Sequence, residues 1–141
     1  NFDEMLQVPN ISNLTGITIG RVDLVGSMGL KRDSINTSQQ VKGLCKTIFS
    51  KAKEKGFKTA MGGGISKEAL PIISEMNSDN LIDKYETRKV VFPSESVSYG
   101  EKSILKAVEF ELLWLKSKER YYHRINLEDK GRIRMLEKRL S

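Results

Sequence analysis

One carboxylate stands where a short apolar segment gives way to a polar one. Residues 16–20 read Gly-Ile-Thr-Ile-Gly, the pattern of a short buried strand, and Asp23 follows in an expected loop. Val22, Leu24 and Val25 are apolar, so an unpaired charge among them would be costly. Ligands of α/β folds bind at the carboxyl ends of strands, so a metal ion or a substrate could be the partner of this carboxylate. On this stretch alone, however, capping of backbone N–H groups by Asp23 is the favoured interpretation.

Three consecutive glycines, Gly62, Gly63 and Gly64, form the second stretch that could bind a ligand. Glycine lets a backbone approach a ligand closely, and the N–H groups that open the expected following helix would face an anion. The stretch matches neither a Walker loop nor a dinucleotide-binding fingerprint. A tight turn without a ligand explains the glycines equally well, so both interpretations stay open.

Other polar residues have two interpretations each. The Arg21 guanidinium could reach a carboxylate or phosphate at the site, or pair with a surface acid. Glu86 and Arg88 are expected on one face of a strand, where an ion pair is favoured over substrate binding. His123 is the only histidine and has no acid or nucleophile placed around it, so a packing or surface role is expected.

The elements that must position these residues alternate between strands and helices. Ser38 is a suitable N-cap for the first long helix and Gly56 ends it, while Pro71 requires a kink or a late start in the second. The alternation predicts βαβ units and a parallel sheet. The expected strands and helices are, in order, 16–20, 38–55, 57–61, 66–76 and 84–92.

Composition bounds the class of protein. With 141 residues, 38% hydrophobic and 30% charged, the chain has the size of one globular domain. It has no apolar run of about 20 residues and no secretory signal pattern, so no membrane contact and a cytoplasmic location are expected. Cys45, the single cysteine, falls at helical spacing among apolar residues and is expected to be a small buried thiol.

The net charge of +6 resides mostly in the tail that begins at Lys116. Tyr121 and Tyr122 beside Arg120 and Arg124 would suit base stacking and phosphate contacts. This arrangement gives an alternative function, a non-catalytic module that binds nucleic acid or an acidic partner. Acidic residues interleave with the basic ones as on an ordinary solvated helix, so nucleic acid is the less favoured partner.

The first thirty residues resemble a known enzyme family. They read Asn1-Phe2-Asp3-Glu4-Met5, then Val8-Pro9-Asn10-Ile11, then a Gly20-x-x-Asp23-Leu24 turn that ends in Ser27-Met28-Gly29. This pattern is similar to the second half of the HpcH/HpaI-type 2-keto-3-deoxy acid aldolases. These enzymes are relatives of the citrate lyase beta chain and are TIM barrels of the phosphoenolpyruvate/pyruvate superfamily. The family usually has Pro and a small residue where this chain has Arg21-Val22.

The resemblance implies a role for each residue of the turn. Asp23 would be a ligand of a catalytic divalent metal, Mg²⁺, Mn²⁺ or Co²⁺. Backbone N–H groups of Gly20, Arg21, Val22 and Asp23 would hold the substrate carboxylate, and the Arg21 side chain would reach the far end of the substrate. The family's other metal ligand, a glutamate, and its catalytic histidine belong to positions before Asn1. We therefore expect an incomplete metal site and an inactive fragment that needs the rest of the barrel or a second chain.

The resemblance also implies the architecture and the reaction. Residues 1–92 would be the last three βα units of a TIM (β/α)8 barrel; a small open parallel α/β domain is the alternative. Residues 93–141 would be C-terminal helices, expected at 101–118 and 126–139, whose apolar faces make an oligomer contact. The implied activity is a metal-dependent carbon–carbon lyase that cleaves a 4-hydroxy-2-keto acid to pyruvate and an aldehyde, or performs related acyl-CoA chemistry. Barrels often bind phosphate after the seventh strand, which is where Gly62–Gly64 would fall.

Overall fold

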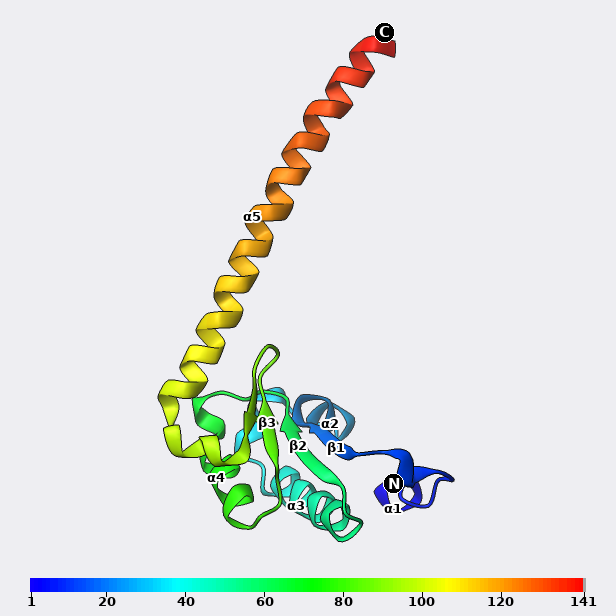
Figure 1. Ribbon diagram of the computed structural model, residues 1–141, viewed down its shortest axis with the longest axis vertical. Coiled ribbons are helices and arrows are strands. Elements are labelled where there is room, and N and C mark those ends of the chain that lie inside the picture. The colour runs from blue at the N-terminus through cyan, green and yellow to red at the C-terminus, as the bar shows by residue number, and fades with distance from the viewer. Residues whose placement is uncertain (141) are drawn as a thin grey trace. The chain divides into compact units, whose positions relative to one another are not determined.

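The computed structural model describes residues 1–140, which form two compact units (Figure 1). The first unit, Asn1–Ala107, is an α/β domain, and the second begins at Val108, inside helix α5 (Glu101–Leu140). The helices and strands of the first unit are α1 (Phe2–Met5), β1 (Gly16–Gly20), α2 (Arg21–Ser27), α3 (Gln39–Glu54), β2 (Lys58–Gly62), α4 (Leu70–Ser78), β3 (Lys84–Glu86) and β4 (Val91–Pro93). Short 3-10 turns lie at Ile11–Asn13, Arg32–Asn36, Lys67–Ala69 and Ser94–Tyr99.

The sheet has four strands in the order β1-β2-β3-β4. The first three strands are parallel, as the alternating pattern predicted, with Gly20 opposite Gly62 at the end of β1 and β2. The fourth strand is antiparallel to β3, so the single strand expected over 84–92 is wrong. The chain reverses at Thr87–Val90, where the Thr87 N–H donates to the Val90 carbonyl and the Thr87 hydroxyl accepts from the Val90 N–H.

The two helices between the parallel strands follow the sequence signals closely. The Ser38 hydroxyl accepts a hydrogen bond from the Val41 N–H at 3.3 Å, and α3 begins at the next residue. Gly56, with a φ of 78°, follows the end of α3. The second helix starts late, at Leu70, because Pro71 fits only the first turn of a helix.

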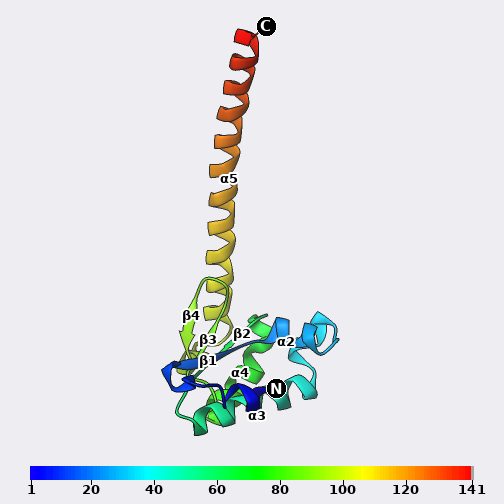
Figure 2. The ribbon, with the colours of Figure 1, turned by 90° about the vertical axis from the view of Figure 1, so that its right-hand side faces the viewer.

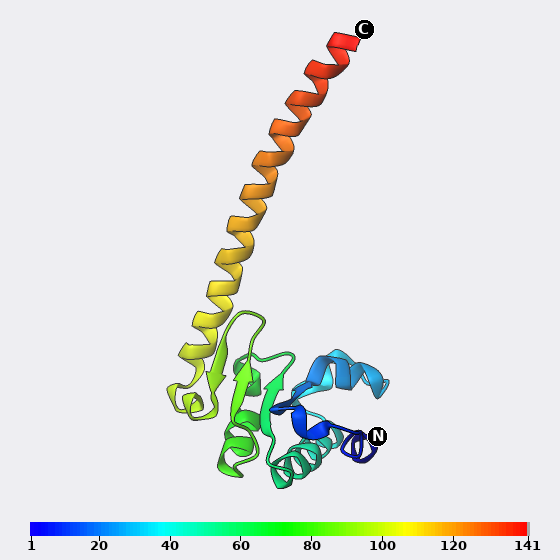
Figure 3. The same ribbon diagram turned by 45° about the vertical axis from the view of Figure 1, so that its right-hand side comes forward.

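All the core helices of the first unit lie on one face of the sheet (Figures 2 and 3). Ile19, Met61 and Tyr85 point from β1, β2 and β3 into that side. The helical residues buried with them are Val25, Val41, Cys45, Phe49, Ile72, Ile73, Met76 and Ile104. The opposite face carries alternate residues such as Thr18 and Lys84, both exposed, and no helix of the first unit covers it. The domain is thus a two-layer α/β structure with one open sheet face.

The carboxyl-terminal part is one helix, α5, in place of the two helices expected at 101–118 and 126–139. The intervening residues contain neither glycine nor proline, so nothing in them ends the helix. Gly131 lies inside the helix, where it has a modest cost. Among residues 1–140, no helix combines the length and the apolar character that crossing a membrane requires.

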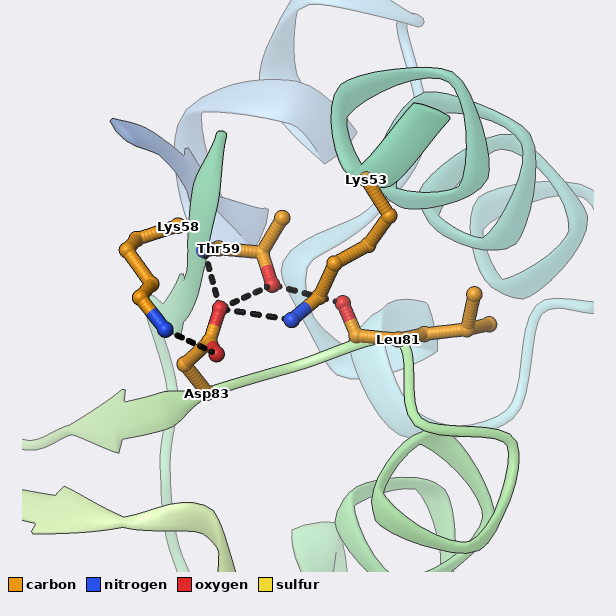
Figure 4. A network of polar contacts seen from close by, with 5 residues as sticks. All are labelled: Lys53, Lys58, Thr59, Leu81 and Asp83. Atoms are coloured by element: carbon orange, nitrogen blue, oxygen red, sulfur yellow. Dashed lines mark hydrogen bonds and ion pairs between the residues drawn. The ribbon is translucent and has the colours of Figure 1, made fainter. Parts of the chain in front are cut away.

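A polar network joins the amino-terminal ends of β2 and β3 (Figure 4). The Asp83 carboxylate accepts hydrogen bonds from Lys53 Nζ and from the Thr59 N–H, both at 2.7 Å, and Lys58 Nζ lies 3.4 Å away. The Thr59 hydroxyl reaches the carboxylate at 3.1 Å and the Leu81 carbonyl at 2.7 Å. Burial raises the pKa of Asp83, but the bonds from Lys53 and Thr59 outweigh it and hold the pKa at about 2.

Candidate functional site at the carboxyl ends of the strands

Asp23 lies in the first turn of helix α2 and not in the loop that the sequence predicted. The helix begins directly after β1, and it places Val25 in the core while Asp23 is exposed. An acid in the first turn is favoured by the helix dipole. No hydrogen bond or ion pair to the Asp23 carboxylate forms within residues 1–140, so the capping of backbone N–H groups that the sequence favoured does not occur in this part of the chain.

A second carboxylate, Glu86, lies on the same face of the sheet. Oδ2 of Asp23 is 2.9 Å from the point that a Cβ on Gly20 would occupy, and Oε1 of Glu86 is 3.3 Å from the corresponding point on Gly62. Gly20 and Gly62 are register partners on adjacent parallel strands, whose side chains point to the same face. Because neither glycine has a side chain, the carboxylates of Asp23 and Glu86 have room to lie over the ends of β1 and β2.

Arg21 is fully buried at the start of α2. Its Nη1 donates to Asn36 Oδ1 at 2.9 Å and its Nη2 donates to the Gly64 carbonyl at 3.3 Å, while Nε has no partner within residues 1–140. Burial lowers the pKa of the guanidinium, and the charge has no carboxylate beside it in the described chain. The side chain therefore joins α2, the Arg32–Asn36 turn and the glycine loop. The pairing with a surface acid, one of the two interpretations of Arg21, does not occur in this part of the chain.

The glycine loop lies directly against the start of α2. A Cβ on Gly63 would be 2.6 Å from the backbone nitrogen of Arg21 and 2.7 Å from that of Val22. Gly63 and Gly64 also have φ angles of 76° and 64°, which favour glycine. A side chain at position 63 would therefore collide with the backbone at the start of α2. Anion binding by Gly62–Gly64 stays a prediction, and close packing is the role that the geometry displays.

No family model, curated protein or solved structure matches the chain.

Some residues of this site lie together as the sequence predicted, and others do not. Asp23, Arg21 and the glycine loop do lie together at the carboxyl ends of β1 and β2, as expected. The expected Glu86–Arg88 ion pair does not form within residues 1–140, because β3 ends at Glu86 and Arg88 is exposed in the hairpin turn. Asn36 was missed, and no sequence signal marks it as a partner of Arg21.

The side chains of this site supply some of the ligands that a hard divalent cation needs. The two carboxylates, of Asp23 and Glu86, offer the oxygen ligands that Mg²⁺ and Mn²⁺ prefer. Residues 1–140 nevertheless contain no group of three or more His, Cys, Asp or Glu side chains placed to hold a metal ion. Further ligands would have to come from substrate, water or another segment.

The aromatic and basic residues of the tail form a cluster on α5. Lys118 Nζ lies 5.2 Å from the centre of the Trp114 ring and 5.5 Å from that of Tyr122, and Arg124 lies 5.7 Å from that of Tyr121. These cations therefore already stack on rings of their own helix. His123 is exposed on the same helix. Binding of nucleic acid or an acidic partner by this cluster stays a prediction.

Proposed function

We propose that the chain supplies part of the active site of a metal-dependent carbon–carbon lyase acting on a 2-keto acid, with residues 1–92 as the last βα units of a closed barrel. The main support is the arrangement of sheet and helices. The strands follow one another in chain order and the core helices lie on one face only. Doubly wound sheets carry helices on both faces, whereas a barrel keeps them outside and leaves its inner strand face to side chains.

The open face and the free strand edge agree with this proposal. The open face holds small or polar residues, Thr18, Ala60 and Glu86, at alternate strand positions. Strand β1 has a partner on one side only in the part of the chain that the structure describes. In the proposed barrel, a strand from the remainder of the protein or from a second chain would pair with the other side of β1.

The proposed site uses the carboxyl ends of the strands. Asp23 would bind the divalent metal, and Glu86 on the same face would add negative charge that raises the affinity for a cation. When bound, Mg²⁺, Mn²⁺ or Co²⁺ supplies Lewis-acid stabilisation of the enolate of the keto acid. Backbone N–H groups of residues 20–23 would orient the substrate carboxylate, and Arg21 would fix the position of that turn through Asn36 and Gly64.

Metal binding by this chain tests the proposal without requiring activity. Titration with Mn²⁺, followed by electron paramagnetic resonance, is expected to show one site. Asp23→Asn should weaken Mn²⁺ binding at least about tenfold, because one carboxylate ligand is lost. The matched control, Asp33→Asn, removes the same charge from an exposed acid in the neighbouring 3-10 turn and should change the affinity less than about twofold. Equal affinities for the two variants would contradict the assignment of Asp23.

Activity should be measured on an assembly in which further strands complete the proposed barrel. There, Mn²⁺ should promote exchange of pyruvate methyl protons with deuterated water, observed by proton NMR. The exchange should be lost in Asp23→Asn and retained in Asp33→Asn. Exchange that does not depend on metal in the complete assembly would refute the lyase assignment.

A further inference from the structure

The second unit consists of a long helix that carries many exposed apolar side chains. From Val108 onward α5 continues for 33 residues, about 50 Å at 1.5 Å per residue. Its large apolar side chains are exposed, among them Leu115 at 47%, Ile133 at 53% and Leu136 at 46%. Most helical stability in proteins comes from packing of an apolar face, so we expect a partner that covers an apolar face of this helix.

The exposed apolar residues follow a coiled-coil spacing. Alternate steps of four and three residues, starting from Val108, give a and d positions of a heptad repeat along one side of the helix. Seven of these ten positions are apolar and the other three are Glu119, Asn126 and Asp129. The ten positions, called the seam below, are Val108, Leu112, Leu115, Glu119, Tyr122, Asn126, Asp129, Ile133, Leu136 and Leu140.

The charges beside the seam are complementary for a parallel pair of identical helices. In that geometry a g residue of one helix faces the e residue five positions later on the other. Glu111 would then face Lys116 of the second copy, and Arg132 would face its Glu137. Both pairs have opposite charges and occur twice by symmetry.

The polar seam residues also favour the parallel, in-register arrangement. Asn126 lies at an a position, where a lone Asn pairs with its own copy and fixes register at a cost in stability. Glu119 and Asp129 would meet their own copies, but Lys118 and Lys130 of the second copy lie at the adjacent g and e positions. In an antiparallel pair that overlaps along the whole seam, Asn126 would instead face Tyr122 and could not pair with its own copy.

We propose that residues 108–140 form a parallel, two-stranded coiled coil with the same helix of a second copy of this chain. The seam residues make the contact, Asn126 fixes the register, and the acids at 119 and 129 make the centre the weakest part. The proposal rests on this helix alone and does not depend on the lyase function.

A matched pair of substitutions tests the contact. Leu112 and Leu113 are neighbours with similar exposure, 50% and 57%, but only Leu112 belongs to the seam. The full chain is expected to sediment as a dimer at micromolar concentration. Leu112→Glu should raise the dimer dissociation constant at least about tenfold, because it adds a charge to an apolar layer. Leu113→Glu should change the dissociation constant less than about twofold, and an equal effect of both variants would overturn the proposed seam.

Cysteine cross-linking tests the orientation. Native Cys45 is fully buried, so a cysteine placed on α5 is the reactive one. Leu136→Cys should form a covalent dimer on mild oxidation, because the two copies of position 136 meet only in the parallel, in-register pair. Ser117→Cys, on the opposite side of the helix, should form little. A monomer at 100 µM, a dimer without the Leu136→Cys cross-link, or a monomer that instead binds an acidic protein or RNA would each overturn the proposal.

Discussion

Replacement of Gly63 by alanine tests the packing of the glycine loop on helix α2. The new Cβ would lie 2.6 Å and 2.7 Å from two backbone nitrogens, which cannot rotate away as a side chain could. Either the loop or the start of α2 must move, and the bond from Arg21 to the Gly64 carbonyl would weaken as a result. Gly56 supplies the matched control, because its φ of 78° is almost the same as the 76° of Gly63 and nothing lies within 4 Å of its Cβ point.

The two substitutions share one cost and differ in the other. Alanine in a left-handed conformation costs about 1 kcal/mol, which Gly56→Ala should show alone. In Gly63→Ala, displacement of backbone and strain on the buried Arg21 bond should add about 2 kcal/mol, for a total of about 3 kcal/mol. The difference of about 2 kcal/mol corresponds to about a thirtyfold change in the unfolding equilibrium constant.

The assay must report on the first unit and not on helix α5. Alkylation of the buried Cys45 thiol in increasing urea meets this need, because the thiol is exposed only when the core of the first unit opens. The urea midpoint of labelling gives the free energy of unfolding for each variant. If Gly63→Ala lowers it no more than Gly56→Ala does, the glycine loop does not pack against α2 as described.

Two further predictions concern titratable groups. The pKa of Asp83 is about 2, below the usual value of about 3.9, so its contribution to stability is present above about pH 4 and is lost as the pH falls toward 2. After a discount for its partial exposure this contribution is about 1 kcal/mol. The urea midpoint of the wild type should therefore fall further between pH 5 and pH 2 than the midpoint of Asp83→Asn. An equal fall in the two proteins would contradict the network. Burial raises the pKa of the Cys45 thiol to about 11, so iodoacetamide at pH 8 should modify it at least about 100-fold more slowly than a free cysteine in the native protein. Fast native alkylation would show that the core around Cys45 opens readily.

The sequence predicted the elements with clear local boundaries. Strand Gly16–Gly20 and helix α3 were predicted almost to the residue, because Ser38 caps the helix and Gly56 ends it. The short helix α2 was missed because its N-cap, Gly20, makes no side-chain bond and two glycines lie in or beside the segment. The hairpin was missed because a Thr87 hydroxyl closes its turn, without the Asn-Gly or Asp-Gly signal of a tight reversal.

The candidate site was predictable only in outline. Ligands of α/β folds bind at the carboxyl ends of strands, and this rule predicted that Asp23 and the glycine loop lie close together there. It could not show that Arg21 is buried, because its partners Asn36 and Gly64 lie 15 and 43 residues away in the chain. Nor could it place Glu86 over Gly62, because that position depends on where β3 ends.

The two edges of the sheet differ in what they can accept. Strand β4 has only three residues, and Pro93 among them has no N–H to donate, so this edge is a poor template for another strand. The outer edge of β1 has five residues and no proline or lysine. A strand from elsewhere would therefore add beside β1, whereas closure of the proposed barrel at the other edge would require a strand to displace β4 from β3.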